Sequence, residues 1–214
     1  MCIRDSYEAA LVCVPISSTS SVIDLLAERM RAGSLLVEIS SVKTPVMESM
    51  RRAHSRGMRT VSIHPLFGPG IGRLCEGRAA IVEVADLEEE MDIASGIFPF
   101  ELIPVSLEEH DRSMAWLALA HLLLNTFLSA SDREADLLLN LQTTTLSWFT
   151  KLAAASLTQS DELTSELIEL NPYFPEVLRS FLGDLSPDMR RIRAKIRRWR
   201  DLLDLRGSYR SLYR

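Results

Sequence analysis

The chain has 214 residues, of which 47% are hydrophobic and 25% charged, and this composition excludes a disordered or collagen-like protein. The net charge is -5, so we expect no nucleic-acid partner and no anionic membrane partner. The three cysteines have no CxxC spacing. We therefore expect neither a disulfide framework nor a metal site, and a reducing, cytoplasmic location.

Residues 1–6 have no apolar core and no amphipathic Arg/Ser pattern, so we do not interpret them as a targeting peptide. Their sequence resembles the translated end of a transposase sequence used to prepare sequencing libraries. We therefore expect a non-native leader at 1–6 and an open reading frame cut short at its 5′ side.

From Tyr7 to Val105, short apolar runs alternate with patterns of helical period. The predicted strands are 10–15, 34–39, 60–63, 79–84 and 100–105, and the predicted helices are 17–33, 45–57 and 87–97. Ser17, Ser18 and Thr19 offer oxygens to cap the first helix. This alternation with short connections favours a parallel sheet wound with helices.

After Val105 the apolar residues recur at three and four, which predicts an all-helical half. The predicted helices are 107–129, 131–158, 161–169, 173–183 and 187–205. The apolar stretch 115–130 contains His121 and Asn125 and is shorter than the ~18 residues of a membrane span, so it is interpreted as a buried helix. We expect two domains, 7–105 and 106–214.

The densest cluster of candidate functional residues is the loop from His64 to Gly70, directly after a predicted buried strand. Ligands of open α/β sheets bind beyond the carboxyl ends of strands, and prolines and glycines give such a loop a close-approach path. The preceding strand ends in Ser41 and Lys43, which are suited to orienting an imidazole and holding a carboxylate. A structural histidine, and simple capping of the next helix by serine or Thr44, remain the alternatives.

Four motifs follow one another in order along the chain. They are Val14-Pro-Ile-Ser17, Glu38-Ile-Ser-Ser-Val-Lys43, His64-Pro-Leu-Phe-Gly-Pro69 and Glu109-His-Asp-Arg112, with His121 in the same helix as the last. This ordered set resembles the prephenate dehydrogenase family, and most closely its archaeal-type members. The resemblance extends from about residue 7 to residue 181.

The resemblance implies an oxidoreductase that converts prephenate to 4-hydroxyphenylpyruvate and CO2 with NAD or NADP, in tyrosine biosynthesis. It implies a Rossmann-like parallel sheet, here incomplete, followed by a helical dimerisation domain in a homodimer. His64 matches the catalytic base and Ser41 the serine that bonds to it. Pro15 and Ser17 match cofactor-binding positions, and His121 matches a substrate-pocket histidine. No metal is implied.

The sequence departs from the family pattern at three places. It contains no GxGxxG turn, which in the family binds the pyrophosphate. The spacing from His110 to His121 is one residue shorter than the family's. The family's carboxylate-binding arginine falls near Ala155, so Lys151 and Lys43 are the remaining candidates to bind the substrate carboxylate. Because of the missing turn, we expect this chain by itself to be inactive.

Two other interpretations stay open. One is a non-catalytic dimeric module that binds a metabolite or a partner, and the other is an arogenate dehydrogenase.

The basic run 188–201 is interpreted as a solvated helix face rather than a nucleic-acid or membrane site, because acidic residues flank it. The wide apolar stripes on 107–158 predict that residues 106–214 dimerise.

Overall fold

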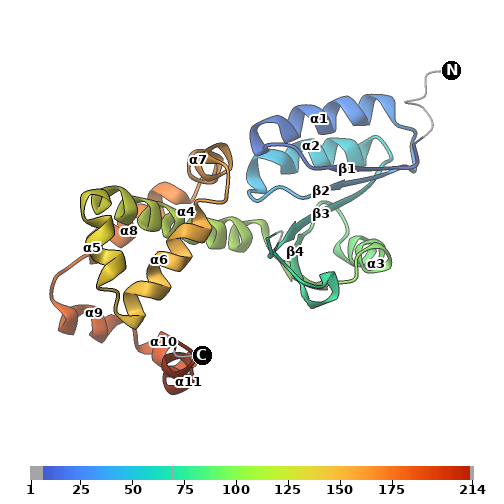
Figure 1. The fold of residues 1–214 in the computed structure, drawn as a ribbon. Coiled ribbons are helices and arrows are strands. Elements are labelled where there is room, and N and C mark those ends of the chain that lie inside the picture. The colour runs from blue at the N-terminus through green and yellow to red at the C-terminus, as the bar shows by residue number, and fades with distance from the viewer. Residues whose placement is uncertain (1–6, 69, 213–214) are drawn as a thin grey trace.

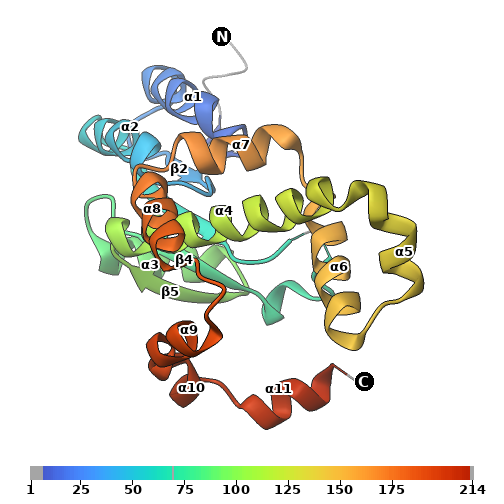
Figure 2. The same ribbon diagram turned by 90° about the vertical axis from the view of Figure 1, so that its left-hand side faces the viewer.

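The computed structural model describes residues 7–68 and 70–212. A mixed sheet with three flanking helices forms the N-terminal half, and helices alone form the C-terminal half (Figure 1). One long helix, α4 (Leu107–Ala130), leaves the sheet and runs through the helical half (Figure 2). The fold class predicted from the sequence is confirmed.

The sheet has five strands in the spatial order β1-β2-β3-β4-β5. The strands are β1 (Ala9–Val12), β2 (Leu35–Glu38), β3 (Arg59–Pro65), β4 (Arg78–Val82) and β5 (Glu101–Val105). The first three are parallel, whereas β4 pairs antiparallel with β3 and parallel with β5. The last two strands thus run opposite to the first three, a direction that their sequences did not reveal.

Helices cover both faces of the sheet. On one face, α1 (Ile16–Arg29) and α2 (Thr44–Ser55) pack together over a core that includes Ile23 and Leu36. On the other face, α3 (Leu87–Ile97) buries Ala94 against the sheet. All eight predicted elements of this half are present, with ends that differ by a few residues.

The helical half continues after α4. Its further helices are α5 (Ala135–Asn140), α6 (Thr144–Ser156), α7 (Asp161–Glu169), α8 (Phe174–Asp184), α9 (Met189–Lys195), α10 (Arg197–Leu202) and α11 (Leu205–Ser211). α6, α7 and α8 pack around α4. Their core also contains Ile16 and Val42 from the sheet half, so the two halves share a core across the predicted boundary at residue 105.

Two helices predicted as continuous are interrupted. The prediction 131–158 divides into α5 and α6, because Thr143 caps α6 by accepting a hydrogen bond from the Leu146 amide. The prediction 187–205 divides into α9, α10 and the start of α11. The like charges of this run, spaced three or four residues apart, weaken a single helix.

The helix α4 is long and apolar enough, by length and composition alone, to cross a membrane, contrary to the shorter stretch expected from the sequence. In this structure its buried face carries polar side chains, namely His110, Asp111 and His121. Its opposite face exposes Trp116 at 52%. The prediction of a buried helix therefore holds for one face of α4.

Candidate functional site

The carboxyl ends of the three parallel strands bring the sequence motifs to one edge of the sheet. Pro15 and Ser17 follow β1, and Ser41 and Lys43 follow β2. His64 is the penultimate residue of β3. This edge is where ligands of parallel α/β sheets bind. The helix α4 packs against it from the other half.

His64 is bonded to a second histidine that belongs to α4. Its Nδ1 lies 3.1 Å from Nε2 of His110, and the two rings meet edge to face with centroids 5.2 Å apart. Nδ1 of His110 lies 2.7 Å from Oδ1 of Asp111. All three side chains are buried. A chain of hydrogen bonds therefore connects the Asp111 carboxylate, through the His110 ring, to the His64 ring.

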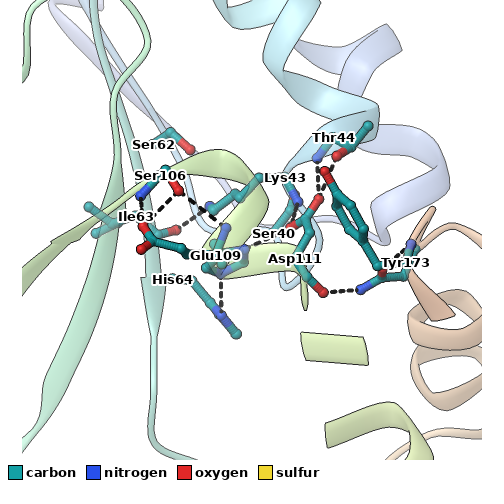
Figure 3. Close-up of polar contacts among 12 residues, drawn as sticks. Ser40, Lys43, Thr44, Ser62, Ile63, His64, Ser106, Glu109, Asp111 and Tyr173 are labelled. Atoms are coloured by element: carbon teal, nitrogen blue, oxygen red, sulfur yellow. Dashed lines mark hydrogen bonds and ion pairs between the residues drawn. The ribbon is translucent and has the colours of Figure 1, made fainter. Parts of the chain in front are cut away.

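Asp111 also caps α2 from a distant part of the sequence. Its carboxylate accepts hydrogen bonds from the amides of Lys43 and Thr44, at 2.9 and 2.8 Å, and from the Thr44 hydroxyl at 2.6 Å (Figure 3). The alternative interpretation, in which a serine or Thr44 caps α2, is wrong, because Asp111 supplies the acceptor. The carboxylate thus holds the loop after β2 and the His110 ring together.

The four residues of the Glu109–Arg112 motif all form polar contacts in the structure. Glu109 completes a capping box with Ser106 at the start of α4. Arg112 forms a two-pronged ion pair with Glu176 on α8, at 3.0 and 3.1 Å. His110 and Asp111 were part of the motif but received no role from the sequence, since their partners are 46 and 67 residues away.

Burial is the largest single influence on the pKa values of His64 and Asp111. It lowers the pKa of His64 to about 3, helped by the nearby positive charge of Lys43 and by His110, while Asp111 opposes the shift. Burial raises the pKa of Asp111, but the hydrogen bonds from His110, Thr44 and Lys43 outweigh this effect and leave the pKa below its usual value. His64 is therefore a neutral imidazole beside an ionised carboxylate.

The ammonium group of Lys43 is bound by other residues of the protein. Its side chain is fully buried, and Nζ lies 2.6 Å from Oε1 of Glu38 and 2.6 Å from the carbonyl oxygen of Ile63. Glu38 also accepts hydrogen bonds from the Ser62 hydroxyl and the Ser40 amide. The expectation that Lys43 binds a substrate carboxylate is therefore wrong for this structure, because its ammonium group already forms a buried ion pair with Glu38.

The N-terminus of α1, beside the predicted cofactor residues, is capped by the helical half. Oε2 and Oε1 of Glu166 on α7 accept hydrogen bonds from the amides of Ile16 and Ser17, at 2.7 and 3.1 Å. The predicted caps from the serines and Thr19 are wrong, since Thr19 instead donates to the Pro15 carbonyl at 3.0 Å. Glu166 and Asp111 thus cap one sheet-half helix each.

Ser41 is half-buried in the loop after β2. In this structure His64 contacts His110 rather than Ser41. Gly68 and Gly70 in the His64 loop have open space where a Cβ would lie. Gly77 differs, because a Cβ there would lie 2.5 Å from the Phe67 ring that anchors this loop.

His121 lies on the same face of α4 as His110. Eleven residues of helix separate them by about 16 Å along the axis and by only about 20° in rotation. The shortened spacing therefore leaves both on one face. Nδ1 of His121 lies 3.1 Å from Oγ of Ser156, which also accepts a hydrogen bond from Asn125 at 2.9 Å.

Lys151 is not brought to this site. Its ammonium group lies 4.8 Å from the centroid of the Trp148 ring. Both residues line a separate hollow with Gln142 and Leu212. The expectation that Lys151 replaces the missing arginine is therefore wrong for this structure, because Lys151 points to a different face of α6 from Ser156.

The described residues fit a dinucleotide cofactor only in part. Pro15 and Ser17 lie at the expected edge of the sheet, but Pro15 has no amide hydrogen and Glu166 already accepts the first amides of α1. Those amides are therefore not available to a pyrophosphate. Among residues 7–68 and 70–212 there is also no cluster of three side chains suited to hold a metal ion.

Comparisons with known proteins agree with the motifs. Residues 3–79 match the nucleotide-binding domain of prephenate dehydrogenase. A curated Methanocaldococcus jannaschii protein, assigned as an arogenate/prephenate dehydrogenase, is 27% identical over 113 residues. That match covers 50% of this chain but only 25% of the relative, so the chain spans about a quarter of that protein.

Solved structures show the same fold. A Corynebacterium glutamicum structure assigned as a prephenate dehydrogenase superposes with a TM-score of 0.70 at 18% identity, covering 94% of this chain and 70% of the other. Prephenate dehydrogenase from Aquifex aeolicus, in complex with hydroxyphenyl propionate and NAD+, has a TM-score of 0.59 at 13% identity, covering 88% and 71%. Together the comparisons agree with the resemblance to the prephenate dehydrogenase family that the motifs carry.

Proposed function

We propose that this chain, whose residues 3–79 match the nucleotide-binding domain of prephenate dehydrogenase, carries the proton-accepting site of an NAD- or NADP-dependent oxidoreductase. The substrate is prephenate, converted to 4-hydroxyphenylpyruvate and CO2 on the route to tyrosine in the cytoplasm. The observation that carries this proposal is the buried chain from His64 through His110 to Asp111 at the ligand-binding edge of the sheet.

In the proposed reaction, His64 accepts the proton of the ring hydroxyl group. A neutral imidazole is the form that can do so. The nicotinamide of a bound cofactor would accept the hydride, and loss of CO2 follows as the ring becomes aromatic. Ser41 orients the hydroxyl group, and His121 contacts the other end of the substrate.

The same site leaves arogenate as the alternative substrate. Prephenate and arogenate carry the same carboxylates and differ in a side-chain keto group, which is an amino group in arogenate. The chain has Ala155 where the family has its carboxylate-binding arginine, and Lys43 and Lys151 do not supply that charge here. A direct comparison of turnover with prephenate and arogenate decides between them.

We further propose that the chain by itself binds the cofactor weakly and is inactive. It lacks a GxGxxG turn, and Glu166 occupies the amides of α1. Titration calorimetry with NAD and NADP should give no dissociation constant in the micromolar range. A chain preceded by a βαβ unit that contains the glycine turn should bind and turn over, and micromolar binding by the chain alone would contradict the proposal.

The helical half is proposed to form a homodimer. Apolar side chains of α5, α6 and the connection between them are exposed, including Leu139 at 61%, Leu141 at 70% and Leu152 at 60%. Exposed apolar surface of this extent is typical of an interface. Sedimentation of the full chain at micromolar concentration should show a dimer. The full chain is required because the helical core includes Ile16 and Val42.

A further inference from the structure

We infer that His110 and Asp111 are positioning residues that fix the tautomer of His64, so that its Nε2 is left free to accept a proton. Two contacts carry this inference, 2.7 Å from Asp111 Oδ1 to His110 Nδ1 and 3.1 Å from His110 Nε2 to His64 Nδ1. The catalytic meaning of the inference rests on the proposed function. The tautomer itself does not.

The direction of each hydrogen bond follows from Asp111. Its carboxylate accepts from two amides, Lys43 and Thr44, and from the Thr44 hydroxyl. An ionised carboxylate has no proton to donate. Nδ1 of His110 must therefore be the donor to Asp111, and this ring nitrogen carries the hydrogen.

With His110 neutral, the second ring then has one arrangement. In a neutral imidazole with a hydrogen on Nδ1, Nε2 is an acceptor. Nε2 of His110 thus accepts from His64, which requires the hydrogen of His64 to be on Nδ1. Nε2 of His64 is left with its lone pair, pointing away from the chain of bonds.

This arrangement matters when His64 takes up a proton. The proton adds to Nε2, Nδ1 keeps its hydrogen bond to His110, and the negative charge of Asp111 stabilises the imidazolium through His110. Lys43 opposes this positive charge, and Glu38 partly neutralises Lys43. Without Asp111, His110 could present a hydrogen on Nε2, and His64 would then carry its own hydrogen on Nε2.

Long-range ¹H–¹⁵N spectra of the full chain, with ¹⁵N-labelled histidine, test the inference without cofactor or substrate. The chain has four histidines, which single substitutions assign. We expect His64 and His110 to carry the hydrogen on Nδ1 near neutral pH. In Asp111→Asn, the amide can donate to His110, and both rings should change to the Nε2–H form. The control Asp86→Asn, at the cap of α3, should leave both unchanged.

A second pair of variants decides the matter if Asp111→Asn does not fold. In His110→Gln the side-chain oxygen can still accept from Nδ1 of His64, so His64 should keep the Nδ1–H form. In His110→Leu that acceptor is lost and His64 should become a mixture of tautomers. An Nε2–H His64 in the unsubstituted chain, or identical His64 spectra in the two variants, would overturn the inference.

Turnover gives the functional readout in a chain preceded by a glycine-turn βαβ unit. His110→Leu should lower kcat by up to about a hundredfold with little change in KM, and His110→Gln should restore part of it. A lack of turnover in the unsubstituted extended chain would contradict the proposed function but not the tautomer. Normal turnover by His110→Leu would contradict the positioning role alone.

Discussion

The α4 helix carries two histidines on one face, His110 in its first turn and His121 near its middle, and their surroundings differ. At the N-terminal end, His110 connects His64 to the Asp111 carboxylate, beside the buried pair of Lys43 and Glu38. Near the middle of α4, the His121 ring contacts the Ser156 hydroxyl, and the His121 carbonyl accepts a hydrogen bond from the side-chain amide of Asn125. Both partners are neutral, so the difference teaches that only the surroundings of His110 fix where a proton sits. A hydroxyl can donate or accept, whereas a carboxylate only accepts.

The largest stability contrast should come from removing one polar side chain near each of the two histidines. Lys43→Met leaves the fully buried Glu38 carboxylate without its cation, and should cost about 3–5 kcal/mol of unfolding free energy. Ser156→Ala removes a neutral hydrogen-bonding hydroxyl and should cost about 1 kcal/mol. Denaturant unfolding measures both.

A double variant, Lys43→Met with Glu38→Leu, controls for the lost charge. It should recover part of the loss, because two apolar residues replace the buried pair. If Lys43→Met were as mild as Ser156→Ala, Lys43 would not be a structural residue, and its assignment to the substrate would have to be reconsidered.

Only the part of the histidine site that depends on local sequence patterns was predictable from the sequence. His64 was located because a strand followed by a Pro/Gly loop is a local signal. Its partner His110 was not, because their contact depends on how α4 packs on the sheet 46 residues later. Lys43 and Lys151 were misassigned for a related reason, since the sequence does not show burial or the direction of a side chain from its helix.

The capping of α1 shows the same limit and supplies the next prediction. Glu166 lies 150 residues from Ile16 in sequence and still accepts its amide hydrogen. Glu166→Ala should cost about 1–2 kcal/mol, because it removes a charged acceptor from a helix N-terminus. Glu169→Ala, an exposed position on the same helix α7, should change stability by less than about 0.5 kcal/mol. Equal effects would mean that Glu166 does not hold the halves together.

A further expected effect is on the pH dependence of stability. Burial lowers the folded-state pKa of both His64 and His121, to about 3 for His64. Below the unfolded value of about 6.5 the unfolded chain binds a proton that the folded chain does not, so stability falls as pH decreases. His64→Asn should flatten the fall between about pH 7 and about pH 5, and His121→Asn should flatten it less.

A His64→Asn slope equal to that of the unsubstituted chain would show that His64 is protonated alike in the folded and unfolded chains, in conflict with its burial.

The most direct test of the account is the rate of reduced cofactor formation from prephenate by the chain preceded by a glycine-turn βαβ unit, with and without His64→Asn. General-base catalysis typically contributes about two to four orders of magnitude, so His64→Asn should lower kcat by that factor with little change in KM. A variant that keeps more than about half of the unsubstituted kcat would contradict the assignment of His64 as the base.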